Sequence, residues 1–208
     1  MPSQDYHERI WESVPEGVEP PQMQLRRDFL LGRVPRLSHV LDVGCGEGRF
    51  AAELAQAGMS VVGVDVAEEP LRRGRARHPG LDLRRVPAEG RWPLPDASFD
   101  VVWAGETIEH VADTAGWLSE LWRVLRPGGT LLLSTPAHGR LAMVALAISG
   151  RAFDAHFDPL ADHLRFYTRR SLRRSLEALG FEQIDVHGAG GVPGLRRLLL
   201  ASARRPDG

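Results

Sequence analysis

The chain has 208 residues, 43 % of them hydrophobic and 25 % charged, which is typical of one soluble globular domain. Its formal net charge is −1, with arginine supplying all 26 basic residues, so no overall field favours nucleic acid or an anionic membrane. The single cysteine, Cys45, excludes an intramolecular disulfide and fits the cytoplasm, where we expect the protein to act. The polar residues 1–9 and the short apolar run 141–148 predict neither a signal peptide nor a membrane span.

In the first half of the chain, predicted strands and helices alternate after an irregular arm over residues 1–21. Apolar residues at helical spacing predict a helix over 22–33, and Pro35 follows its end. Short apolar runs predict strands over 40–43, 60–64, 81–86 and 99–103. The stretches 46–57 and 68–77 between them are predicted helices, and Gly58 ends the first of these.

The second half contains two more predicted helices and three more strands. Asp113 is the expected N-cap of a helix, and the Pro-Gly-Gly turn at 127–129 leads into a strand over 130–134. Residues 136–167 break the alternation and are predicted to be an insertion. Thr168 is the expected cap of the next helix, which Gly180 ends. The last strands, 181–187 and 195–203, lie too close in sequence for a parallel crossover and should pair as a hairpin.

This order predicts a doubly wound α/β fold, Rossmann-like, with a mainly parallel seven-stranded sheet and a C-terminal antiparallel hairpin. We expect a single domain over 1–208, divided into an N-terminal arm and helix (1–36), a ligand-binding core (37–135), a lid insertion (136–167) and the C-terminal part of the sheet (168–208). Within the insertion, the run 141–148 predicts a core helix; the alternative is a lid helix that touches an apolar substrate or a membrane surface.

A glycine loop follows the first predicted strand. Gly44, Gly46 and Gly48 lie between this strand and a helix, where glycine lets the backbone turn sharply and a ligand approach closely. Asp42 stands at the carboxyl end of the strand and would repel the pyrophosphate of a dinucleotide. Asp65 ends the next strand, where its two oxygens can accept both hydroxyls of a ribose. The alternative role for both aspartates is helix N-capping.

The ordered set of motifs over residues 40–136 resembles class I S-adenosylmethionine (SAM) methyltransferases, particularly the ubiquinone-pathway O-methyltransferases. The segments are LDVGCGEG (41–48), VVGVD (61–65), PLPDASFDVV (93–102) and LWRVLRPGGTLLLSTP (121–136). The resemblance implies a SAM-binding core over 37–135, in which the cofactor lies against Asp42, Gly44, Cys45, Gly46, Asp65, Val66, Ala88, Glu89, Ala104 and Gly105. The family often has an aspartate before the Ala-Glu pair, where this chain has Pro87, so we expect adenine recognition to depend on backbone groups or Glu89.

A cluster of ionisable residues follows the fourth predicted strand. Glu106, Glu109 and His110 are spaced so that one helical turn would place them on a common face near the transferred methyl group. With His163 from the insertion they could hold Mg²⁺, Mn²⁺, Fe²⁺ or Zn²⁺, an arrangement resembling that of two methyltransferase families. Those families act on ubiquinone precursors and on the 3′ ends of small RNAs. Without a metal, His110 could act as a general base, or the cluster could serve only structure.

We therefore expect a SAM-dependent methyltransferase that methylates an oxygen of a small metabolite, with His110, Glu106 and Glu109 as catalytic residues. Aromatic residues of the arm and the insertion would roof the acceptor pocket or pack the lid; they are Tyr6, Trp11, Phe153, Phe157, Phe166 and Tyr167. His138 and His156 are further possible site residues there. The alternatives are a metal-dependent RNA 3′-terminal 2′-O-methyltransferase, which the near-zero charge disfavours, and a SAM-binding partner protein without turnover. A homodimer is possible.

Overall fold

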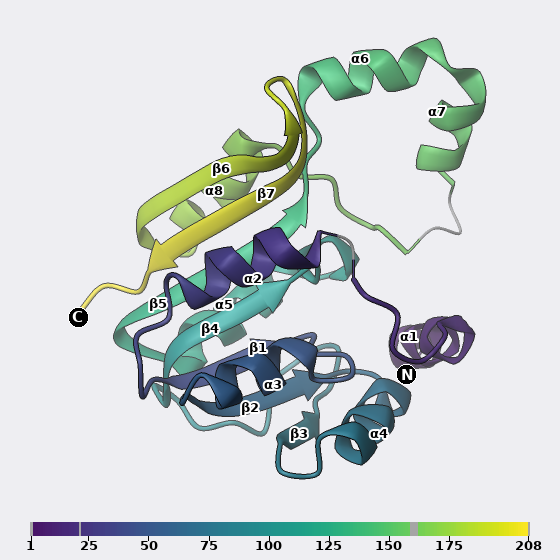
Figure 1. Ribbon diagram of the computed structural model, residues 1–208. Coiled ribbons are helices and arrows are strands. Elements are labelled where there is room, and N and C mark those ends of the chain that lie inside the picture. Colours follow the sequence, from purple (N-terminus) through teal and green to yellow (C-terminus); the bar gives the residue numbers. More distant parts are fainter. Residues whose placement is uncertain (1, 21, 159–161, 208) are drawn as a thin grey trace.

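The computed structural model describes residues 2–20, 22–158 and 162–207, which form a seven-stranded sheet flanked by helices (Figure 1). The strand order is β3-β2-β1-β4-β5-β7-β6. Strands β1 to β5 run parallel, whereas β7 is antiparallel to both β5 and β6. The strands are β1 (His39–Val43), β2 (Ser60–Asp65), β3 (Asp82–Arg85), β4 (Phe99–Gly105), β5 (Leu125–Pro136), β6 (Glu182–Val192) and β7 (Leu195–Arg204). The predicted doubly wound sheet with its C-terminal hairpin is confirmed.

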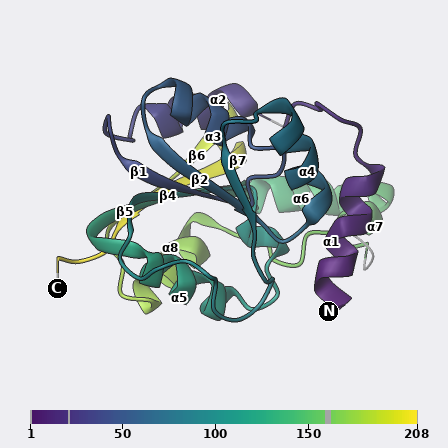
Figure 2. The same cartoon turned by 90° about the horizontal axis from the view of Figure 1, so that it is seen from below.

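Helices cover both faces of the sheet (Figure 2). One face is packed by α2 (Met23–Leu31) and α3 (Arg49–Gln56), with α4 (Glu68–Arg77) at the β3 edge; α5 (Thr114–Val124) and α8 (Arg169–Ala178) pack the other. Alternate strand residues feed two separate cores, so that Trp103 and Leu132 pack toward α2 and α3. Val102 and Leu131 point the other way, toward α5 and α8.

The predicted caps hold, whereas several element boundaries differ from expectation: β6, for example, extends to Val192 rather than residue 187. The Asp113 carboxylate accepts a hydrogen bond from the Gly116 N–H, and Thr168 forms a capping box with Ser171. Helix α3 starts at residue 49 rather than 46, because the loop glycines before it have positive φ. Strand β5 begins at residue 125, ahead of the expected Pro-Gly-Gly turn, because Leu125 already pairs with Phe99 of β4.

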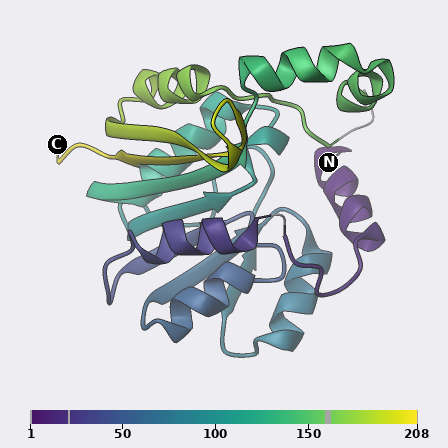
Figure 3. The same ribbon diagram turned by 45° about the horizontal axis from the view of Figure 1, so that its top comes forward.

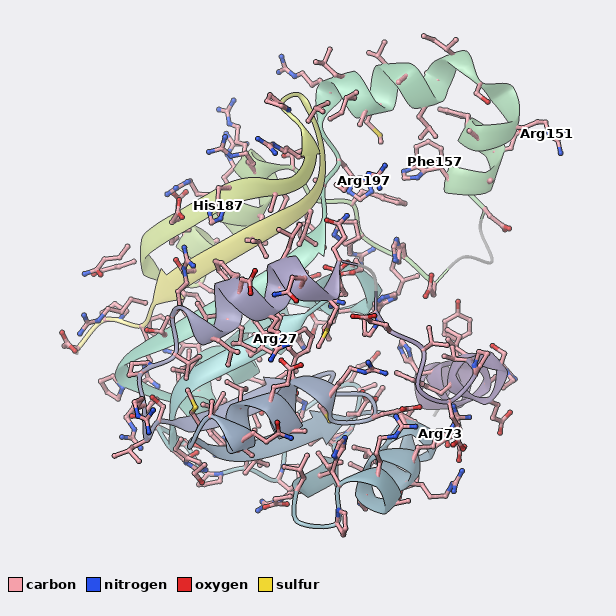
Figure 4. The ribbon with its side chains drawn as sticks, viewed as in Figure 1. Arg27, Arg73, Arg151, Phe157, His187 and Arg197 are labelled. Atoms are coloured by element: carbon pink, nitrogen blue, oxygen red, sulfur yellow. The ribbon has the colours of Figure 1, made fainter. Side chains whose placement is uncertain are left out.

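The expectation of an irregular N-terminal arm is wrong. Helix α1 spans Pro2–Ser13 and lies beyond the carboxyl ends of the strands (Figures 1 and 3). It is held by polar contacts with α4, whose first-turn N–H groups at Glu68 and Glu69 donate to the Glu8 carboxylate. The Arg73 guanidinium donates to the carbonyls of Trp11 and Val14 and lies between α4 and α1 (Figure 4). Such contacts between distant segments leave no periodic signal in the arm itself.

The expected core helix over 141–148 is also contradicted. Residues 136–167 contain α6 (Arg140–Ile148) and α7 (Gly150–His156), which stand away from the sheet, and neither helix has a buried residue (Figure 3). Leu141, Val144 and Ile148 are exposed although α6 is almost entirely apolar. The insertion, called the lid below, therefore projects beside the carboxyl ends of the strands (Figure 1). No helix in the described ranges is long and apolar enough to cross a membrane.

Candidate functional site

The glycine loop forms the floor of a site at the carboxyl end of β1. Gly44 and Gly46 have φ of 68° and 54°, a region in which other residues are strained. A Cβ atom at Gly44 would lie 2.5 Å from the Thr107 hydroxyl, and one at Gly46 would lie 2.9 Å from the Trp11 ring. The Gly44 and Cys45 N–H groups donate to the Val64 carbonyl, which ties the loop to β2. The loop thus leaves no room for a side chain at these two positions.

Asp42 and Asp65, the two predicted acidic residues, are both buried beside this loop, and neither caps a helix. Asp42 is 2 % exposed, and its Oδ2 atom has no hydrogen-bond partner among the described residues. Burial raises its pKa to about 7; a backbone hydrogen bond from Ala51 opposes the shift, and the charge of Asp65 adds to it. Asp65 accepts from the N–H groups of Gly46 (2.9 Å) and Ala67 (3.0 Å), and burial raises its pKa as well. One carboxylate oxygen of Asp42 is therefore buried without a hydrogen-bond donor among the described residues.

Arg26 is a site residue that the sequence analysis missed. It is 2 % exposed, and its guanidinium lies 5.3 Å from the centre of the Phe50 ring. Burial lowers its pKa, while the charges of Glu106, Glu109 and Asp42 oppose the shift, so the cation faces three carboxyl groups. The signal was present, because Arg26 occupies a position on the buried stripe of α2 otherwise formed by Met23, Phe29 and Leu30. A charged residue on an apolar stripe indicates a function more often than an exposed one.

The residues after β4 adopt a different local structure from the predicted helical turn. Glu106 has φ 54°, and the following turn is the short 3-10 helix η1 (Ile108–His110), so the three residues do not share one face of an α-helix. The Ser134 hydroxyl donates to Glu106 at 2.9 Å, which holds Glu106 toward β5. Glu109, His110 and His163 nevertheless come together, with ligand atoms all within 4.8 Å of one another. Glu106 lies outside that group.

Hydrogen bonds fix the orientation of His110 and leave one oxygen of Glu109 without a partner. The His110 Nδ1 atom lies 2.9 Å from the Asp162 carbonyl, which can only accept, so the proton is on Nδ1 and the Nε2 lone pair is free. Nε2 lies 3.9 Å from Glu109 Oε1, which has no hydrogen-bond partner in the described ranges. Burial raises the pKa of Glu109 to about 8, helped by Glu106, and lowers that of His110. This pairing of a neutral imidazole and a buried carboxyl fits a cation site or a proton acceptor.

The other predicted cofactor residues lie around the same end of the sheet. Val66 and Cys45 are half-buried, and burial raises the pKa of the Cys45 thiol well above its usual value. Ala88 and Glu89 line a cavity of about 260 Å³ together with Trp92, Trp117 and other residues of the α5 start. Ala104 and Gly105 end β4 next to the glycine loop, where Ala104 pairs with Val43 of β1. All ten predicted cofactor residues therefore lie at or near the carboxyl ends of the parallel strands.

Solved structures with the same fold are class I SAM-dependent methyltransferases. A SAM-dependent methyltransferase from Mesorhizobium loti superimposes with a TM-score of 0.69 at 24 % identity, covering 88 % of this chain and 97 % of that one. Phosphoethanolamine N-methyltransferase 2 from Haemonchus contortus, in complex with SAM, gives a TM-score of 0.73 at 18 % identity, covering 98 % of this chain and 57 % of that one. At these identities the likeness establishes the fold alone.

Residues 18–186 match the family described as a methyltransferase domain, and the chain belongs to that family. A probable SAM-dependent methyltransferase of Mycolicibacterium smegmatis is 41 % identical over 165 residues, 74 % of this chain and 60 % of that protein. A ubiquinone biosynthesis O-methyltransferase of Dinoroseobacter shibae is 36 % identical over 155 residues, 72 % of this chain and 62 % of that protein. The 27-O-demethylrifamycin SV methyltransferase of Amycolatopsis mediterranei is 36 % identical over 138 residues, 62 % and 50 %. The chain thus matches half to three-fifths of these relatives' length.

Proposed function

We propose that the protein transfers the methyl group of SAM to a hydroxyl oxygen of a small molecule. The observation that carries this proposal is the convergence of Glu109, His110 and His163 beside the glycine loop, at the carboxyl end of β4. A hydroxyl acceptor must lose its proton, and this cluster supplies groups that can take it or stabilise the oxyanion. The relative from Dinoroseobacter shibae is named an O-methyltransferase, and the one from Amycolatopsis mediterranei is named for an O-demethylated substrate, which agrees with an oxygen acceptor.

SAM fits the charges and the shape of the site. The backbone of the glycine loop receives the methionine part of the cofactor, and Asp42, whose Oδ2 atom has no hydrogen-bond partner among the described residues, accepts its ammonium group. Arg26 faces the same pocket and balances the cofactor's carboxylate, while Asp65 accepts the ribose hydroxyls. When bound, SAM supplies the methyl group. A bond forms between the acceptor oxygen and the methyl carbon while the bond between that carbon and the sulfur breaks, which leaves S-adenosylhomocysteine.

The His110 ring can assist the loss of the acceptor proton in one of two ways, as a general base or as a ligand of a cation that acts on the acceptor oxygen. Its neutral state and its free Nε2 lone pair suit a general base, and the Asp162 carbonyl keeps the ring in this tautomer. The same atoms also suit a divalent cation, because Glu109 Oε1 is buried without a partner and lies next to the two imidazoles. We propose that Glu109, His110 and His163 hold this cation, with Glu106 nearby. The bound cation would act as a Lewis acid on the acceptor oxygen.

Calorimetry tests these assignments in sequence. Protein treated with a chelator is titrated with S-adenosylhomocysteine, and then separately with Mg²⁺, Mn²⁺ and Zn²⁺. We expect micromolar binding of S-adenosylhomocysteine, and a heat of metal binding that disappears in Glu109→Ala and His110→Ala but persists in His78→Ala, a histidine at the far end of α4. Enzymatic activity is measured as the transfer of a labelled methyl group from SAM to catechol. Absence of S-adenosylhomocysteine binding would overturn the proposal; binding and turnover without a metal heat would leave His110 as the base and remove the metal.

A further inference from the structure

A second cluster of imidazole and aromatic rings lies between the lid and the sheet. His138 follows β5, His156 and Phe157 come from the end of α7, and Phe166 comes from the segment that returns from the lid. The His138 ring lies 5.4 Å from His156 and 5.0 Å from Phe166, and His156 lies 5.1 Å from Phe166 and 4.9 Å from Phe157. Figure 4 shows Phe157 on α7, on the side that faces the sheet. These separations are those of interacting rings.

The two histidines of this cluster have polar atoms without a partner. His138 is 8 % exposed, and its Nδ1 atom has no hydrogen-bond partner within the described ranges; the same holds for the buried Nε2 atom of His156. Burial and the facing His156 lower the pKa of His138, against the opposing effect of the Tyr167 and Pro136 carbonyls. Buried polar atoms are normally hydrogen-bonded, so two orphaned nitrogens in one cluster indicate that a ligand supplies the partner.

The aromatic members of the cluster leave apolar surface open. Phe157 is 48 % and Phe166 is 40 % exposed, although both rings already contact the histidines. A flat ring placed against them would cover this surface while its polar substituents met the imidazole nitrogens. Apolar walls with a few polar atoms are the usual composition of a small-molecule site.

One chain segment joins this cluster to the proposed reaction centre. At its start, the Asp162 carbonyl accepts from His110 and the N–H groups of Leu164 and Arg165 donate to the Glu109 carbonyl. At its end, the Tyr167 carbonyl accepts from the His138 N–H. Phe166 follows His163 by three positions, so their Cα atoms lie at most about 10 Å apart. A single acceptor can therefore reach both places.

We infer that the cluster of His138, His156, Phe157 and Phe166 binds the far end of the methyl acceptor, as a planar aromatic group that carries hydroxyl or carbonyl oxygens. This inference rests on the proposed function and adds the acceptor class: a molecule larger than one catechol ring, with a polar aromatic part up to about 10 Å from the methylated oxygen. The phenylalanines stack on the ring, and the imidazoles pair with its oxygens.

Two flavones serve as probes: luteolin, and the analogue that keeps its catechol ring but lacks its two other hydroxyls. Both are titrated into protein loaded with S-adenosylhomocysteine. We expect wild-type protein to bind luteolin roughly tenfold more tightly, the contribution of one or two hydrogen bonds. His156→Phe keeps a ring and removes the nitrogens, so it should abolish this preference; Phe166→Leu should weaken both ligands. Val144→Ala, on the exposed face of α6, is the matched lid control and should bind both as wild type does.

The outcomes separate the two proposals. Equal affinity for both flavones in wild-type protein, no flavone binding, a wild-type preference in His156→Phe, or wild-type affinity for both flavones in Phe166→Leu would overturn the inference while S-adenosylhomocysteine binding upholds the cofactor site. Loss of S-adenosylhomocysteine binding in wild-type protein would overturn the proposed function and the inference with it. Each variant is accepted only if its S-adenosylhomocysteine affinity matches the wild-type value, which shows that it folds; His138→Phe replaces a variant that fails this criterion.

Discussion

Replacing Asp42 by asparagine should make the ligand-free protein more stable than wild type at neutral pH. This advantage should become smaller in acid. Burial raises the pKa of Asp42 from 3.8 to about 7. Between these two values the folded protein binds more protons than the unfolded chain, so wild-type stability falls as pH rises through this window. The shift of about 3 units corresponds to at most about 4 kcal/mol, because one unit is worth 1.36 kcal/mol. Asparagine carries no charge and escapes this cost.

Urea unfolding of ligand-free wild type and Asp42→Asn at pH 5, 6, 7 and 8 measures the effect, with exposed Glu177→Gln as the control. The advantage of Asp42→Asn over wild type should grow by about 2 to 3 kcal/mol from pH 5 to pH 8. Calorimetry should show the reverse for ligand: S-adenosylhomocysteine binds wild type more tightly as pH rises past 7, because its ammonium needs the ionised carboxylate, and this dependence is absent in Asp42→Asn. A stability difference that is constant with pH would refute the reasoning.

Three further predictions concern the loop, the buried cation and the metal. Gly46→Ala should weaken S-adenosylhomocysteine binding at least tenfold, since its Cβ would collide with an indole ring; Gly90→Ala, also at positive φ but with open space around it, should retain the affinity, as calorimetry can show. Arg26→Met should lower the free energy of unfolding by roughly 3 kcal/mol, because it leaves buried carboxyl groups without their cation. Replacing the exposed Arg27 by Met should change the free energy of unfolding by less than about 1 kcal/mol. Equal losses of stability for the two variants in denaturant titrations would contradict this prediction. Zn²⁺ binding at pH 7 should release protons from Glu109, whose pKa is about 8, so that the measured heat depends on the ionisation enthalpy of the buffer; a buffer-independent heat would argue against Glu109 as a ligand.

The parts of the fold that follow from local sequence were predictable. Strand alternation, the Asp113 and Thr168 caps and the short final connection each act within a few residues, and all have the predicted form. Helix α1 was missed because Glu8 and Arg73 hold it across about 60 residues of sequence. Helix α6 was predicted as core from its composition, but apolar content alone does not tell which face has something to pack against.

The site shows the same division. Asp42 and Asp65 were located from their positions at strand ends, and the sheet register brings both to the glycine loop. The approach of His163 to His110 was expected only from resemblance, because the insertion has no periodicity that would fix its path. The geometry of Glu106 could not be foreseen, since the positive φ that turns it toward Ser134 replaces the helical spacing assumed for it.

The hydrogen bond between the His110 ring and the Asp162 carbonyl couples the orientation of this ring to the position of the segment that returns from the insertion. Asp162 belongs to the segment that leads back from the lid, and the next residues of that segment are tied to the Glu109 carbonyl. A lid movement that carries this segment away would remove the acceptor that fixes the imidazole tautomer. Under the proposed function, the orientation of the His110 ring and the position of the segment over residues 162–167 are therefore coupled.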